Sequence, residues 1–201
     1  MNPYNARAIR FVAALAGFAV IAVGAVCIAQ SAAQSAKESA PHANAAVGSS
    51  NASPIYGVTI PPGYRDWELI SLNHLVTDKV GQLRAQFGND IAIKAFKEGT
   101  VPFPDGTIIA AVHWNQVSSK ETDQLIGGTF PGAHSVFAGS PANVQFMVKN
   151  SKKYAATGGW GFADFKNGKP SDLAVHEACF PCHEPAKAHD FVFAHYAPAP
   201  P

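Results

Sequence analysis

The stretch HEACFPCHEP, residues 176–185, constrains this chain more than any other part of it. It holds two of the chain's three cysteines, three positions apart, with a histidine directly after the second. Cys-x-x-Cys-His is the pattern of covalent haem attachment. The thiols of Cys179 and Cys182 would add to the two vinyl groups of the porphyrin. The imidazole of His183 would then lie beneath the iron, because the three side chains can share one face of a helical turn.

Two other interpretations of this motif remain open. The cysteines could form a disulfide or a redox-active pair, but a redox pair is typical of a βαβ context, which this C-terminal segment lacks. A zinc site needs four ligands, and His189 and His195 could be imagined as the second pair. A histidine directly behind the second cysteine fits a zinc site poorly. We therefore favour one covalently attached haem c, with His183 as the proximal iron ligand.

The group on the other side of the iron decides what such a haem can do. Electron-transfer cytochromes c commonly use a methionine there. This chain has Met1 in its first segment and Met147 upstream of the motif, and we interpret Met147 as a packing or surface residue. His176 precedes the attachment site by one helical turn and is badly placed to cross the ring. A role on the surface or in hydrogen bonding is also favoured for each of the remaining histidines: His74, His113, His134, His189 and His195. The expected state is a five-coordinate haem with an open sixth position.

The first thirty residues have the order of an export signal. Arg7 and Arg10 precede an uncharged apolar run, residues 11–29, which is followed by small polar residues. We expect residues 1–30 to be a signal peptide. The alternative is an uncleaved membrane anchor, because residues 11–29 are about long enough to span a bilayer as one helix. Either way the remainder is exported, and we expect a periplasmic protein with no membrane contact other than residues 11–29.

Composition divides the rest of the chain into a linker and one domain. Residues 31–53 are rich in alanine and serine and contain almost no large apolar side chains, so we expect a flexible linker. Residues 54–198 would form the haem domain. The chain carries a formal charge of only +1 and has no long basic run, which gives no indication of nucleic-acid binding.

The domain pattern predicts several strands followed by helices. Alternating or β-branched runs predict strands over 67–76, 80–88, 107–118, 142–150 and 159–165. In the first of these, Trp67, Leu69 and Ser71 would face one way. Asn89 as N-cap and Gly99 beyond the end predict a short helix between them. Residues 171–196 are mostly helical in pattern. The expected fold is α+β, mainly antiparallel sheet with flanking helices and a C-terminal haem-attachment helix.

The chain is rich in aromatic residues, with 13 phenylalanines and 3 tryptophans. Many of them fall on predicted elements: Phe87, Phe96, Phe103, Trp114, Phe146, Trp160 and Phe162. Each by itself is typical of an ordinary core. Together they could wall a flat apolar macrocycle, and a dry distal side would favour neutral diatomic ligands over anions.

Four motifs of this domain occur together in a known family. They are PPGYRDWELI, FPDGTII, VKNSKKYAATGGWGFADF and CFPCHEPAKAHDFVFAHY, in this order between about Pro61 and Pro198. With them the chain resembles the cytochrome P-460 family, which includes the cytochromes c′-β. The resemblance implies an exported homodimer with a mostly antiparallel β domain. It also implies a five-coordinate, His-ligated c-type haem.

The same resemblance implies one of two chemistries. Cytochrome P-460 proper oxidises hydroxylamine, with nitric oxide also implicated, on a haem cross-linked to a lysine. The c′-β members lack the cross-link and bind gases such as nitric oxide. The cross-linking lysine stands four positions after the threonine of D-G-T, where this chain has Ala111, and no lysine occurs between Lys97 and Lys120. His113 could approach the haem edge or distal pocket, although a core or interface role is favoured.

The expected function is therefore a c′-β-like protein that takes up nitric oxide or a similar small ligand. The alternatives are a hydroxylamine-type oxidoreductase and a simple electron carrier that works with a partner cytochrome. Whether the chain is an enzyme stays undecided, and no catalytic residue is assigned. Cys179, Cys182 and His183 are the predicted haem-binding residues.

Overall fold

The fold is seen in a computed structural model that describes residues 51–198. The predicted signal segment, residues 1–30, and residues 31–50 of the predicted linker lie outside the described residues. Ser53, at the end of that linker, is buried, and its hydroxyl donates to the carbonyl of Phe162 at 3.2 Å. The packed part of the chain therefore includes Ser53. None of the helices within 51–198 is long and apolar enough to cross a membrane.

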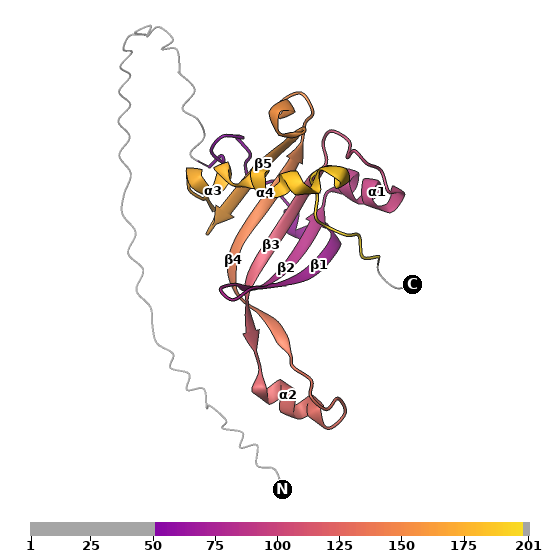
Figure 1. The fold of residues 1–201 in the computed structure, drawn as a ribbon, viewed down its shortest axis with the longest axis vertical. Helices are drawn as coiled ribbons and strands as arrows, with labels where there is room; N and C mark the ends of the chain where they lie inside the picture. The colour runs from indigo at the N-terminus through magenta and orange to yellow at the C-terminus, as the bar shows by residue number, and fades with distance from the viewer. Residues whose placement is uncertain (1–50, 199–201) are drawn as a thin grey trace, which may run out of the picture. The chain divides into compact units, whose positions relative to one another are not determined.

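A six-stranded antiparallel sheet forms the centre of the domain (Figure 1), with neighbouring strands in sequence order. Its strands are β1 (Glu68–Val76), β2 (Gly81–Gly88), β3 (Ile108–Ser118), β4 (Val136–Lys149), β5 (Trp160–Lys166) and β6 (Lys169–Pro170). Antiparallel neighbours need no crossover connection. Short turns join β1 to β2 and β5 to β6, whereas the longer connections β2–β3 and β3–β4 each contain a helix. The short 3₁₀ segments η1 (Tyr64–Asp66) and η2 (Ala155–Thr157) precede β1 and β5.

The strand β1 departs from the alternation expected from sequence. A register shift between Leu69 and Ser71 leaves Ile70 and Ser71 both buried, although they are consecutive. A β-bulge of this kind adds one residue to one strand, so side chains beyond it change face. The predicted grouping of Trp67, Leu69 and Ser71 on one face therefore does not hold along the whole strand.

The helix α1 (Asp90–Glu98) is confirmed together with both of its predicted ends. The Asn89 side chain accepts from the backbone N–H of Ala92, and Gly99 ends the helix with a φ of 65°, a left-handed value that glycine adopts without cost. Asn89 also ties the helix to the sheet, because its side-chain oxygen accepts from the N–H of Ile108 at 3.1 Å.

A long β3–β4 hairpin carries a helix that the sequence pattern did not predict. The helix α2 (Lys120–Gly127) lies at the far end of the hairpin in Figure 1. Ser119 caps it by accepting from the N–H of Thr122. None of the residues of α2 is buried, so it lacks the apolar stripe by which amphipathic helices are recognised in sequence.

The C-terminal segment is helical, as predicted, and contacts the sheet at β5. It consists of α3 (Leu173–Glu177), α4 (Cys179–His183) and the 3₁₀ segment η3 (Glu184–His189), and both α3 and α4 contact β5. In Figure 1 these elements, in orange-yellow, cross in front of the sheet. An antiparallel sheet with helices packed against it confirms the α+β class.

The core lies between the sheet and these flanking elements. Its largest fully buried side chains include Trp160, Phe146, Phe165 and Ile70. The rings of Phe103 and Trp160 meet edge-on at a centroid distance of 5.9 Å. Of the aromatic residues singled out by sequence, Phe103, Phe146, Trp160 and Phe162 are buried, while Phe87 and Phe96 are partly buried against the same core.

Candidate haem site

The three motif residues line one cavity. Cys179, Cys182 and His183 all belong to α4 and all face a cavity of about 680 Å³ between the C-terminal helices and the sheet. Positions i, i+3 and i+4 of a helix lie on one side of it, which explains why the side chains converge. The structure thus brings together the residues that the sequence predicts to hold haem.

The imidazole of His183 is oriented by the backbone that follows the motif. Its Nδ1 lies 2.7 Å from the carbonyl oxygen of Phe191. A carbonyl can only accept, so Nδ1 carries the proton and Nε2 is left as the free donor atom for a metal. Burial lowers the pKa of His183, which favours the neutral ring that metal ligation requires. The rings of Phe162 and Phe193 each lie with their centroid 5.0 Å from that of the imidazole.

The two thiols are free, and Cys179 lacks the electrostatics of a redox-active cysteine. No disulfide joins Cys179 and Cys182. Burial, with smaller contributions from Asp164 and Cys182, raises the pKa of the Cys179 thiol to about 11. Redox-active cysteines have a lowered pKa, because the thiolate is the reactive form. This environment is therefore unlike that of a catalytic dithiol. Within residues 51–198 no group of three or more His, Cys, Asp or Glu side chains could hold a metal ion by itself.

One part of the cavity wall is apolar. Ile109, Met147 and Phe162 lie in one row across three neighbouring strands, since Ile109 pairs with Met147 and Met147 with Phe162. Opposite partners on an antiparallel sheet project to the same face, which makes this row continuous. The sequence prediction treated Met147 as a packing or surface residue. The structure places it both in the core and in the cavity wall.

The next row on the same face is polar, with one small residue in it. Gln86 pairs with Ala111, and Ala111 with Gln145. All three line the cavity. Ala111 is the position at which the resemblance places a cross-linking lysine, and no lysine of the described segment 51–198 lines this cavity. The Oε1 atom of Gln86 is buried without a hydrogen-bond partner among the described residues.

A third row carries Arg84, His113 and Asn143, which pair across β2, β3 and β4. His113 is only 3% exposed, and it lines the cavity together with Arg84. Its Nδ1 lies 2.9 Å from the Oδ1 of Asn143. Burial, and secondarily the charge of Arg84, lowers the pKa of His113 to about 4, so the ring is neutral at neutral pH.

The remaining histidines of the described segment lie away from this cavity. His176 is fully buried, and both ring nitrogens have backbone partners, the N–H of Asp164 at 3.1 Å and the carbonyl of Asp172 at 3.0 Å. His74 and His134 are exposed. As the sequence indicated for His176, none of these is placed to reach a group in the cavity.

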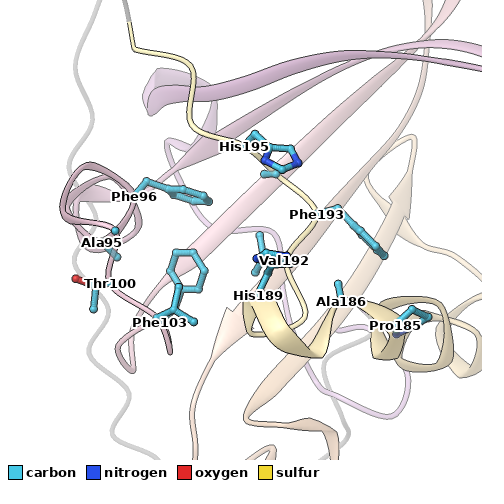
Figure 2. Close-up of a pocket in the computed structure, with 13 residues that line it drawn as sticks. Ala95, Phe96, Thr100, Phe103, Pro185, Ala186, His189, Val192, Phe193 and His195 are labelled. Atoms are coloured by element: carbon cyan, nitrogen blue, oxygen red, sulfur yellow. The ribbon is translucent and has the colours of Figure 1, made fainter.

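His189 and His195 line a second, smaller cavity of about 380 Å³. Figure 2 shows it between α1, represented by Phe96, and the segment that follows the motif. It contains none of the three motif side chains. Val192, Phe193 and Ala194 border both cavities.

The larger cavity fits haem in its donors, lining and size. His183 presents a free Nε2, and the two thiols lie on the same side of the helix. Apolar residues from three neighbouring strands form part of the cavity wall. Its volume lies within the roughly 300–1,000 Å³ of typical cofactor and ligand sites. Cys179 and Cys182 would hold the group and His183 would face its iron.

The sequence of residues 61–194 matches the family model described as Cytochrome P460. The chain belongs to the cytochrome P460 family. Membership implies that this chain binds haem, and it confirms the resemblance seen in the four sequence motifs. No curated protein sequence matches the chain at a significant level.

Sequence reasoning missed the polar wall of this cytochrome P460 family site. Arg84, Gln86 and Gln145 were read only as strand residues. A signal was present, because Gln86 and Gln145 are uncharged polar residues inside otherwise buried strands. Such residues at inward positions need partners. Gln145 donates to Asp164, whereas the Oε1 of Gln86 has no partner among the described residues.

Proposed function

We propose that this chain is an exported monohaem c-type cytochrome that binds nitric oxide or a similar small ligand. Cys179 and Cys182 would attach the haem covalently, and His183 would be its proximal ligand. When bound, the haem would supply an iron with one open coordination position. The observation that carries the proposal is Ala111, which stands in the cavity wall where the hydroxylamine-oxidising members would have a cross-linking lysine.

The cavity lining supports an open sixth position. Among residues 51–198, His113 is the one histidine besides His183 that lines the cavity. His113 lies within β3, a strand held on both sides by β2 and β4, rather than on a segment that could approach the iron freely. The apolar row of Ile109, Met147 and Phe162 favours small neutral ligands, because it offers no charge to an anion.

The absorption spectrum of the purified protein, with and without nitric oxide, tests this proposal. We expect a high-spin, five-coordinate haem at rest and a spectral change that saturates with nitric oxide. A six-coordinate, low-spin spectrum at rest would contradict the proposal.

Met147 favours a second candidate function, that of an electron carrier. Within the part of the chain that the structure describes, it is the one methionine that lines the cavity, and methionine is the usual sixth ligand of electron-transfer cytochromes c. Replacing Met147 by leucine keeps its volume but removes the sulfur. If Met147 ligates the iron, the resting spectrum changes from low-spin to high-spin; under the first proposal, Met147→Leu leaves it unchanged.

The third candidate is oxidation of hydroxylamine, as the resemblance to cytochrome P-460 proper implies. Without a lysine at position 111 we expect little turnover with hydroxylamine and an artificial electron acceptor. Steady turnover by the wild-type chain would favour this function over ligand binding alone.

We also propose export to the periplasm and assembly as a homodimer. Export is supported by the order of residues 1–30 and by the requirement of covalent haem attachment, and the homodimer by the resemblance. N-terminal sequencing of the mature protein would show whether residues 1–30 are removed. Light scattering would report two copies of the chain per particle.

A further inference from the structure

The polar part of the cavity wall contains His113, and hydrogen bonds within the sheet determine which of its two ring nitrogens carries the proton. His113 is held in the row Arg84–His113–Asn143, and the chain of hydrogen bonds continues beyond Asn143 to Asp164 on β5. None of these contacts involves the haem-binding motif. The chain of bonds is thus a property of the sheet itself.

Asp164 determines how the amide of Asn143 is turned. Its Oδ2 accepts from the Nδ2 of Asn143 at 2.5 Å and from the Nε2 of Gln145 at 2.9 Å, and its Oδ1 accepts from Ser171. A carboxylate only accepts, so the NH₂ group of Asn143 has to face it. The Oδ1 of Asn143 then faces His113.

This arrangement fixes the tautomer of His113. The Oδ1 of Asn143 is an acceptor, so Nδ1 of His113 must carry the proton in the bond that joins them at 2.9 Å. In the neutral ring Nε2 then carries a lone pair. Burial and the neighbouring guanidinium of Arg84 keep the ring neutral, with a pKa of about 4.

Two acceptor atoms are consequently left without donors at this wall. The Nε2 of His113 has no hydrogen-bond partner within the described residues, and neither has the buried Oε1 of Gln86. Both side chains line the cavity that His183 also lines. An unpaired buried acceptor such as the Oε1 of Gln86 is rare in proteins. The Nε2 of His113, on a residue that lines the cavity, is open to a ligand that brings an N–H or O–H group.

We propose that His113 is a specificity-determining hydrogen-bond acceptor for protic ligands held in this cavity. The ligand class is small neutral molecules with an N–H or O–H group, in contrast to aprotic gases such as nitric oxide. The inference rests on the proposed function only in requiring that the cavity holds haem. It adds a preference among ligands that the fold of the family by itself does not imply.

The test compares the binding of one protic and one aprotic ligand to the intact haem protein. Hydroxylamine, without an electron acceptor, and nitric oxide are titrated separately and followed by absorption. In His113→Leu we expect the affinity for hydroxylamine to fall about tenfold, the size of one hydrogen bond, and that for nitric oxide to stay within about twofold. His113→Gln, which keeps an acceptor, should recover most of the hydroxylamine affinity.

A matched replacement outside the cavity controls for the loss of a histidine. His134 is exposed, and His134→Leu should leave both affinities at the wild-type value. Unchanged hydroxylamine affinity in His113→Leu would overturn the inference. So would an equal loss for both ligands, because that indicates a purely structural role. Absence of nitric oxide binding in the wild-type protein would instead contradict the proposed function, so the two failures are distinguishable.

Discussion

Three histidines of this chain show how the surroundings of a residue set its chemistry. His183 donates from Nδ1 to a backbone carbonyl, which leaves Nε2 for a metal. Both ring nitrogens of His176 form hydrogen bonds with backbone groups, so neither is available to another partner. His113 donates to an asparagine and keeps an acceptor toward the cavity. In each case the partner of one nitrogen decides what the other can do.

The buried, neutral His113 predicts a specific pH dependence of stability. Its pKa is about 4 in the folded protein, below the ordinary value of 6.5, so the unfolded chain binds a proton that the folded chain does not. The contribution of His113 to the free energy of unfolding should therefore be fully present above pH 6.5. The free energy of unfolding should fall by about 3 kcal/mol as the pH drops toward 4. The charged groups around the ring are Arg84, which opposes its protonation, and Asp164, which favours it.

Denaturant unfolding at several pH values measures this effect. In His113→Gln the free energy of unfolding should depend less on pH between 6.5 and 4. His134→Gln, at an exposed position, should keep the wild-type dependence. Parallel curves for wild type and His113→Gln would show that another group is responsible.

Replacing Ala111 by lysine tests how close this position lies to the haem. Its side chain lines the cavity between Gln86 and Gln145, so a lysine there would extend toward the bound haem. With hydrogen peroxide added as the two-electron oxidant, we expect the amine of Ala111→Lys to form a C–N bond to a haem ring carbon in place of its C–H bond, which would shift the absorption to longer wavelength. Ala111→Met has a similar length without the amine, and its spectrum should stay at the wild-type position. An unshifted Ala111→Lys spectrum would mean that position 111 does not meet the haem edge.

Buried polar contacts hold the segment that follows the motif. Asp190 and Phe191 both have left-handed backbones, with φ of 51° and 66°. Their conformation is maintained by a buried ion pair between Asp190 and Lys149, at 2.7 Å, and by the N–H of Phe103, which donates to Asp190 at 2.8 Å. Because the carbonyl of Phe191 accepts from His183, this clamp also positions the imidazole of His183.

Loss of Lys149 should therefore destabilise the domain and loosen His183. Lys149→Met leaves the Asp190 carboxylate buried without its partner, which typically costs about 3–5 kcal/mol. Chemical denaturation measures the free energy of unfolding, and resonance Raman spectroscopy measures the iron–histidine stretch, which should broaden. Lys166→Met, at the exposed end of β5, should change stability by less than about 0.5 kcal/mol. A stable Lys149→Met with an unchanged stretch would show that the clamp is dispensable.

Sequence patterns predicted most of the helices and strands. They failed where the pairing between strands, rather than the periodicity of side chains along one strand, sets the structure. The helix α1 was predictable because Asn89 and Gly99 act locally on the backbone next to them. The bulge in β1 was not, since it depends on how Leu69 and Ser71 meet the residues of β2. The exposed helix α2 was missed because none of its residues is buried.

For the molecule as a whole, the cavity and the hydrophobic core are continuous. Phe146, Met147 and Phe162 belong to both, so a bound haem would complete the core rather than occupy its surface. Ligands that bind only the folded state stabilise it, and a covalently attached one cannot dissociate.

Removing both cysteines of the motif tests whether the haem is attached covalently. In the double variant Cys179→Ser/Cys182→Ser we expect no haem to remain on the denatured chain, and a melting temperature below that of the wild type. Intact-mass measurement and haem staining after denaturing electrophoresis detect the attachment. Cys27→Ser replaces the third cysteine and should keep the haem. Haem retained by the denatured double variant would show attachment through another residue.

Local sequence patterns predicted the α+β class, which the structure confirms, and the haem-binding residues, whose role stays a prediction. The motif could do so because Cys179, Cys182 and His183 are neighbours on one helical turn, a geometry that local backbone structure sets. Only the tertiary structure decided what faces them. Gln86, Ala111 and His113 come from two strands whose register and bulges depend on pairing between distant parts of the chain. The fixed tautomer of His113 further requires Asp164 from a third part, and no pattern along one strand encodes that contact.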